Sequence, residues 1–252
     1  MDLYRITHPL RLAKGSHQLG SGKGCAMNVI SYINGDEQIT DFPATSARPL
    51  SLLVQSSNDL LAGPDGYLSP ENSVLALDLA WRTVGTADVP DAVVHAWLAE
   101  LLTNPTWGVL GYAKITAVKA IRDIAQLHRA AASADMPAAA VWDAAELAAR
   151  ALTPSLDAAG LYAVRAAYES TALVDTRLRV TVEEVTAHAL RAHALAARSG
   201  MASRIVAITG HAIDSWRQLA GLDSSPSLSR TTRAHRPDSH RAVRRSAALA
   251  GS

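Results

Sequence analysis

The sequence has very little of several features that define major protein classes. It contains one cysteine, Cys25, so an internal disulfide is excluded, and this is typical of proteins from the reducing cytoplasm. No run approaches the ~18 uninterrupted apolar residues of a membrane-spanning helix. The first five residues, 1–5, lack the apolar segment of a secretory signal. We therefore expect a cytoplasmic protein that has no membrane partner.

Known metal and nucleotide motifs are also missing. The chain has no HExxH or CxxC spacing, so the sequence predicts neither a metal site nor a cofactor. The glycine-rich stretch 20–25 fails as a phosphate-binding loop, because His17 stands where the first glycine belongs and Gly24 where the hydroxyl belongs. Its backbone amides, helped by Lys23, can still hold an anion, although a flexible connector is the simpler interpretation.

What is abundant is helix-forming sequence. Of the 252 residues, 48% are hydrophobic and 19% are charged, which is globular rather than disordered composition. Apolar residues recur at helical spacing, and no convincing strand pattern appears. The sequence predicts a compact all-α domain of about eight to ten helices. We expect helices over 25–34, 50–62, 70–84, 90–102, 109–133 and 201–220, two more that begin at Pro137 and Pro154, and one from the capping box at 181–184 to about Gly200.

Charge divides the chain into a body and a tail. From Leu222 onward, six Arg and two Asp give +4, whereas residues 1–221 carry −3. We therefore expect a helical domain over 1–223, made of an irregular lead-in (1–24), a segment 25–90 and Ala-rich helices (91–223). A basic, flexible tail over 224–252 follows.

Cys25 is the candidate nucleophile. It lies at the start of a predicted helix, close to Lys23, and both features lower the pKa of a thiol. With His17 or Asp41 it would form a catalytic group. The alternative is a buried structural cysteine, which is a frequent core residue.

Other polar residues accompany this segment. Asp41, Asn58 and Asp59 are candidate binding residues that gather near Cys25 if a shared site exists. Otherwise Asp41 shapes its loop, while Asn58 and Asp59 face water. We expect His188 and His193 near the surface of their helix. The five tryptophans are scattered, which indicates core anchors: Trp81, Trp97, Trp107, Trp142 and Trp216.

Four short motifs carry a family resemblance. The segments 25–28 (Cys-Ala-Met-Asn), 41–44 (Asp-Phe-Pro-Ala), 58–59 (Asn-Asp) and 84–86 (Val-Gly-Thr) resemble a pattern of uncharacterised proteins from actinobacteria and their phages. The resemblance covers residues 20–90. It implies a source rather than an activity. Those proteins carry a second cysteine where this chain has Thr45, so a thiol pair is not expected here.

Two function hypotheses follow. The first is a non-enzymatic helical interaction protein, encoded by a phage or mobile element, that binds a protein or nucleic acid. The second is a thiol-dependent enzyme that uses Cys25. In the first hypothesis, the tail binds an acidic partner, and nucleic acid is the first candidate. The alternatives are a solvated tail that aids solubility and a short helix over 241–249. The oligomeric state stays open. The arginines concerned are Arg230, Arg233, Arg236, Arg241, Arg244 and Arg245.

Overall fold

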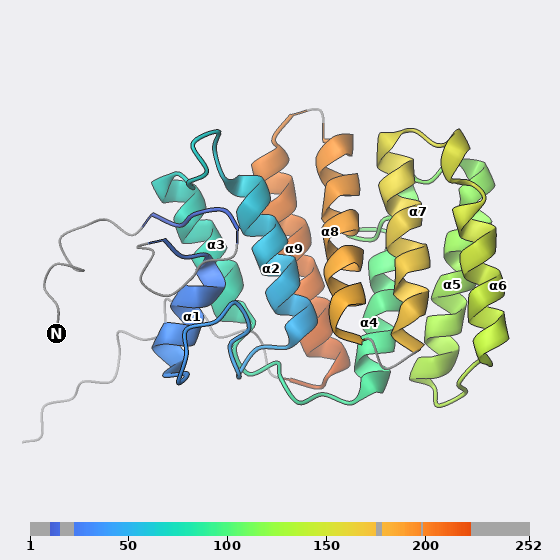
Figure 1. Ribbon diagram of the computed structural model, residues 1–252, viewed down its shortest axis with the longest axis horizontal. Helices are drawn as coiled ribbons and strands as arrows, with labels where there is room; N and C mark the ends of the chain where they lie inside the picture. The colour runs from blue at the N-terminus through green and yellow to red at the C-terminus, as the bar shows by residue number, and fades with distance from the viewer. Residues whose placement is uncertain (1–10, 16–22, 175–177, 198, 223–252) are drawn as a thin grey trace, which may run out of the picture.

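The computed structural model describes residues 11–15, 23–174, 178–197 and 199–222 (Figure 1). Within these residues the chain forms nine α-helices and no strand, which confirms the all-α prediction. The predicted tail, 224–252, lies outside the described residues. The helices are α1 (Ala26–Asn34), α2 (Arg48–Leu61), α3 (Pro70–Arg82), α4 (Asp91–Thr103), α5 (Ile115–Ala132), α6 (Ala139–Arg150), α7 (Ala158–Ser170), α8 (Leu178–Ala196) and α9 (Met201–Leu219).

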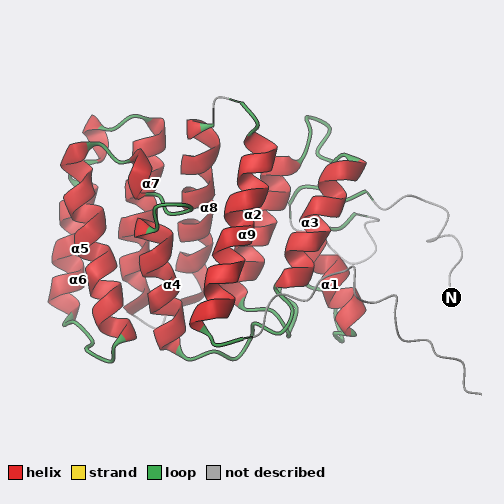
Figure 2. Ribbon diagram, turned by 180° about the vertical axis from the view of Figure 1, so that it is seen from behind, coloured by secondary structure: helices red, strands yellow, loops and turns green. Residues whose placement is uncertain are grey.

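The helices form an elongated bundle. In both views α1 and α3 lie at one end and α5 and α6 at the other, with α2, α4, α8 and α9 between them (Figures 1 and 2). The α7 helix packs along α8, which in turn packs against α2. Segments that are far apart in the sequence, such as α2 and α9, are therefore neighbours in the centre of the bundle.

Local signals place several helix ends correctly. The Ser69 hydroxyl accepts a hydrogen bond from the amide of Asn72, so it caps α3 directly before Pro70. Pro49 lies in the first turn of α2, where its missing amide hydrogen is not needed. Gly35 ends α1 with a φ of 78°, a left-handed conformation that glycine adopts without strain.

Three predicted helix starts are wrong. The helix expected over 109–133 begins at Ile115, because the chain first makes a separate 3-10 turn over Leu110–Tyr112. Pro154 belongs to another such turn, and α7 starts only where Asp157 caps it by accepting from the amide of Gly160. Helix α6 starts two residues after Pro137.

The predicted capping box also fails. Helix α8 begins at Leu178, so residues 181–184 lie inside the helix rather than at its start. No Gly or Pro lies between Asp175 and Thr181 to stop the helix from extending toward its N-terminus.

Tryptophans anchor the core, as predicted. Trp97 of α4 and Trp216 of α9 are buried and meet edge to face, with ring centroids 5.6 Å apart. The Trp97 indole also donates to the carbonyl of Ala212 at 2.8 Å. Trp107 and Trp142 are buried as well, whereas Trp81 is half-buried. The two central tryptophans thus join α4 to α9.

The prediction that His193 lies near the surface is wrong, since its side chain is only 1% exposed. Its Nε2 lies 2.9 Å from the carbonyl of Trp107, to which it donates, and its Nδ1 lies 2.6 Å from the hydroxyl of Tyr112. In the neutral imidazole Nε2 therefore carries the proton and Nδ1 is the acceptor. Burial lowers the pKa of His193 to about 4. His188 is half-buried.

Candidate functional site

The fold brings Cys25 and Asp41 together. Cys25 precedes the first turn of α1, and its Sγ lies 3.4 Å from Oδ1 of Asp41. Asn28, one turn along α1, donates to the same carboxylate oxygen at 2.8 Å and accepts from the Cys25 amide at 2.9 Å. Gln55 of α2 donates to the backbone carbonyl of Asp41 at 2.9 Å. Three hydrogen bonds thus fix the loop containing Asp41 against α1 and α2.

The predicted low pKa of Cys25 is wrong. Burial, followed by the negative charge of Asp41, raises the pKa of the thiol to about 12, although the amides of Asn28 and Met27 act in the opposite direction. The side chain is 1% exposed. At neutral pH the group is therefore a protonated thiol beneath the surface, which is the form that does not act as a nucleophile.

Asn58 also lies beside Cys25 and does not face water. It is fully buried in α2; its Nδ2 donates to the carbonyl of Ala13 at 2.9 Å, and its Oδ1 accepts from the amide of Ala26 at 3.4 Å. The next residue, Asp59, accepts from the amide of Gly15 at 2.8 Å. Both side chains therefore satisfy backbone groups of neighbouring segments.

The remaining predicted site residues are dispersed or lie outside the description. The Lys23 ammonium lies 5.4 Å from the centroid of the Tyr67 ring, and the guanidinium of Arg11 lies 4.7 Å from the same ring. His17 falls outside the described residues, as do the six tail arginines. Among the described residues, no group of three or more His, Cys, Asp or Glu side chains is arranged to hold a metal ion.

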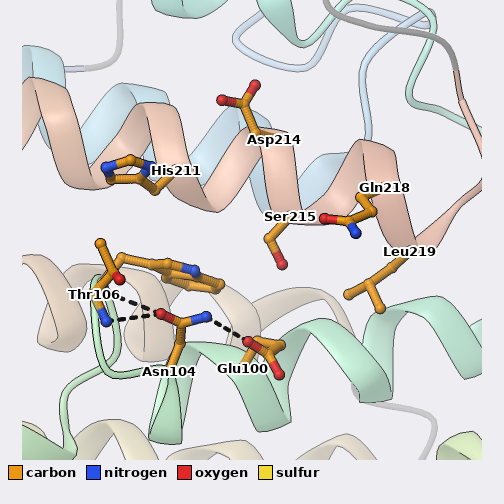
Figure 3. A pocket seen from close by; sticks show the side chains of 9 residues that line it. Glu100, Asn104, Thr106, His211, Asp214, Ser215, Gln218 and Leu219 are labelled. Carbon is orange, nitrogen blue, oxygen red and sulfur yellow. Dashed lines mark hydrogen bonds between the residues drawn. The ribbon is translucent and has the colours of Figure 1, made fainter.

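A pocket that the sequence did not predict lies between α4 and α9 (Figure 3). It is open to solvent and has a volume of about 740 Å³. Ser215 and Gln218 of α9 face Glu100 and Asn104 across it. Since α4 ends at Thr103 and α9 begins only at Met201, no local pattern could have indicated this pairing. The lining residues are Glu100, Asn104, Thr106, Trp107, His211, Asp214, Ser215, Gln218 and Leu219.

The floor of this pocket is built around Asn104. Its side chain accepts from the amide of Thr106 at 2.8 Å and donates to Oε2 of Glu100 at 2.6 Å. Gly108 closes the turn, and a Cβ there would lie only 2.5 Å from the backbone nitrogen of Asn104. Two carboxylates and no Lys or Arg line the pocket, and one of them, Asp214, is paired with Arg82 at 2.7 Å. The pocket therefore does not suit an anionic ligand.

Comparisons with protein-family models, curated proteins and solved structures found no match for this chain. No helix in the described parts of the chain combines the length and apolar character needed to span a lipid bilayer.

Proposed function

We propose that this protein is a non-enzymatic helical binding protein whose partner is an acidic macromolecule, and that nucleic acid is that partner. One observation carries the proposal. The cysteine that would make the chain an enzyme is 1% exposed, and its thiol is protonated at neutral pH. The polar groups around it form hydrogen bonds within the fold, so the segment 25–59 supports structure rather than chemistry.

Charge indicates the partner. The sequence from Leu222 onward carries +4, with six arginines spread over residues 230–245. Arginine binds phosphate oxygens through several N–H donors, and each phosphate that is neutralised releases a counterion. A phage or mobile-element origin and a cytoplasmic location belong to the same proposal, since the motifs in residues 20–90 and the lone cysteine favour them.

Salt dependence tests the proposal. If the tail neutralises four to six duplex phosphates, log K against log salt has a slope of about −4 to −5 from the tail alone. The matched comparison is the full-length chain with all six tail arginines changed to Gln, here called the tail-neutral variant. We expect it to lose that part of the slope and keep its helical circular dichroism. Equal slopes for the two proteins would overturn the proposal.

The enzyme alternative has its own test. A Cys25→Ser variant keeps a hydroxyl within reach of Asp41 but removes the thiol. We expect it to bind nucleic acid like the natural chain. If the variant folds but no longer binds nucleic acid, Cys25 has a functional role and the proposal is wrong on this point.

A further inference from the structure

A second group of positive charges lies on the helical body, around Tyr162 of α7. The guanidinium carbons of Arg165 and Arg191 lie 5.6 and 5.7 Å from the centroid of the Tyr162 ring. The imidazole of His188 lies 5.5 Å from the same ring, centroid to centroid. We call these four residues the Tyr162 cluster.

Helix geometry explains why the four side chains converge. Tyr162 and Arg165 are three residues apart on α7, and His188 and Arg191 are three apart on α8, so each pair lies on one face of its helix. Helices α7 and α8 stand side by side and pack along their length (Figure 1). Arg191 is exposed and the other three are half-buried, so the cluster is accessible from solvent.

The two arginines of the Tyr162 cluster have no acidic partner among the described residues. Neither arginine forms an ion pair or a hydrogen bond with the described residues, and Nε of Arg165 and Nδ1 of His188 are buried without a partner. Elsewhere on the body, Arg11, Arg82 and Arg150 each pair with a carboxylate at 2.7 Å. The positive charges of Arg165 and Arg191 beside one ring repel each other, and a bound anion would offset this repulsion.

One carboxylate is close but is used elsewhere. Glu184, one turn before His188 on α8, is hydrogen-bonded to Glu169, whose pKa is raised by burial and by that neighbouring charge. Its charge raises the pKa of His188, but burial and then Arg165 and Arg191 outweigh it and lower that pKa. Since each arginine acts on His188 more strongly than Glu184 does, the charges around the imidazole are net positive.

We propose that Arg165, His188 and Arg191 bind a phosphate group of a nucleic-acid strand on the face where α7 packs against α8. The inference rests on the proposed function and adds a contact on the folded body to the contacts of the tail. Each guanidinium offers N–H donors that no described residue uses, and a phosphate supplies the acceptor oxygens and the negative charge that the cluster lacks. The Tyr162 ring holds both arginines in place through cation–π contacts.

The test measures binding of the full-length protein to a fluorescent DNA duplex of about 20 base pairs, between about 50 and 200 mM salt. The test variant carries Arg165→Gln and Arg191→Gln. The control carries Lys119→Gln and Arg122→Gln, which remove the same charge from exposed positions on α5. Loss of the one phosphate contact makes the slope shallower by about 0.9, so the affinity lost across this salt range shrinks about threefold. The control should leave the slope near that of the natural chain.

Three results would overturn the inference: a test variant with the slope of the natural chain, a test variant that matches its control, or a natural chain that binds no duplex at about 50 mM salt. The tail-neutral variant is measured in parallel, so failure of the tail and failure of the cluster are distinguished. If the test variant does not fold, NMR spectroscopy of the natural chain replaces it. The Nε–H resonances of Arg165 and Arg191 should then shift when duplex is added, and unchanged resonances would contradict the site.

Discussion

The two polar regions of this molecule, around Cys25 and around Tyr162, differ in whether their polar groups are paired. Near Cys25, a thiol, a carboxylate and two amide side chains are linked by hydrogen bonds to each other and to the backbone. Around Tyr162, two arginines and a histidine converge, and neither arginine has an acidic partner among the described residues.

The contrast shows why residue type alone is a poor guide to a site. The Cys25 region has the residue types of a catalytic group, but its thiol is buried and its polar groups are hydrogen-bonded within the fold. The Tyr162 cluster contains ordinary surface residue types, but its unpaired charge is available to a ligand. Pairing, more than composition, separates structural from functional polar groups.

The largest expected effect is on the reactivity of Cys25. With a pKa of about 12, the thiol of the native protein should react with iodoacetamide at about pH 8 roughly a thousandfold more slowly than an ordinary cysteine. The unfolded chain in denaturant provides the control and should react at the ordinary rate. Equal reaction rates in the native and unfolded protein would show that Cys25 is not a buried, protonated thiol, and the contrast with the Tyr162 cluster would be lost.

Acid should destabilise the protein through two buried histidines, His128 of α5 and His193 of α8. Burial lowers the pKa of His128 to about 3 and that of His193 to about 4, so the unfolded state binds more protons as the pH falls below about 6.5. At about pH 5 each residue should cost roughly 2 kcal/mol of the free energy of unfolding.

Urea unfolding at several pH values measures this effect. A His193→Gln variant should be less stable near neutral pH but should show a weaker fall in stability toward pH 5, since one titrating group is gone. A fall as steep as that of the natural chain would show that His193 is not the buried, neutral group described here.

Loss of Asn58 should have the next largest effect. In an Asn58→Ala variant, the carbonyl of Ala13 and the amide of Ala26 lose their side-chain partner in a buried position, which should cost about 2–4 kcal/mol. Asn34→Ala, at an exposed position on the neighbouring α1, is the control and should cost about 0.5 kcal/mol or less. Thermal unfolding compares the two, and similar losses would mean that the Asn58 bonds contribute little.

The smallest expected effect is that of the Tyr162 cluster on the stability of the protein. Changing Arg165 and Arg191 to Gln should alter the free energy of unfolding by only about 0.5 kcal/mol, because no ion pair is broken and a repulsion is relieved. A loss above about 2 kcal/mol would place these arginines with the structural polar groups near Cys25. Urea titration of the variant and of its Lys119/Arg122 control gives the comparison.

Sequence reasoning succeeded where the signal was local. Ser69 followed by Pro70 defined a helix start, and Gly35 a helix end, because both act within one turn. The pKa of Cys25 was predicted in the wrong direction, since its burial depends on how α1 packs against other helices. His193 was misplaced for the same reason: its partner, Tyr112, comes from a turn eighty-one residues away.

The pocket and the Tyr162 cluster were missed for a related reason. The pairs Tyr162 with Arg165 and His188 with Arg191 were readable as one-turn spacings on two helices. That the consecutive helices α7 and α8 pack together was foreseeable, but the rotation and register that bring the two pairs to one ring were not. Likewise, the pocket depends on the pairing of α4 with α9, which only the folded chain reveals.

The most direct test of a helical protein that binds nucleic acid through unpaired arginines is the salt slope of duplex binding in the natural chain. Tail and cluster together predict a slope of about −5 to −6, of which about −1 should remain in the tail-neutral variant. A natural chain that shows no duplex binding at about 50 mM salt, or a slope near zero, would contradict this assignment.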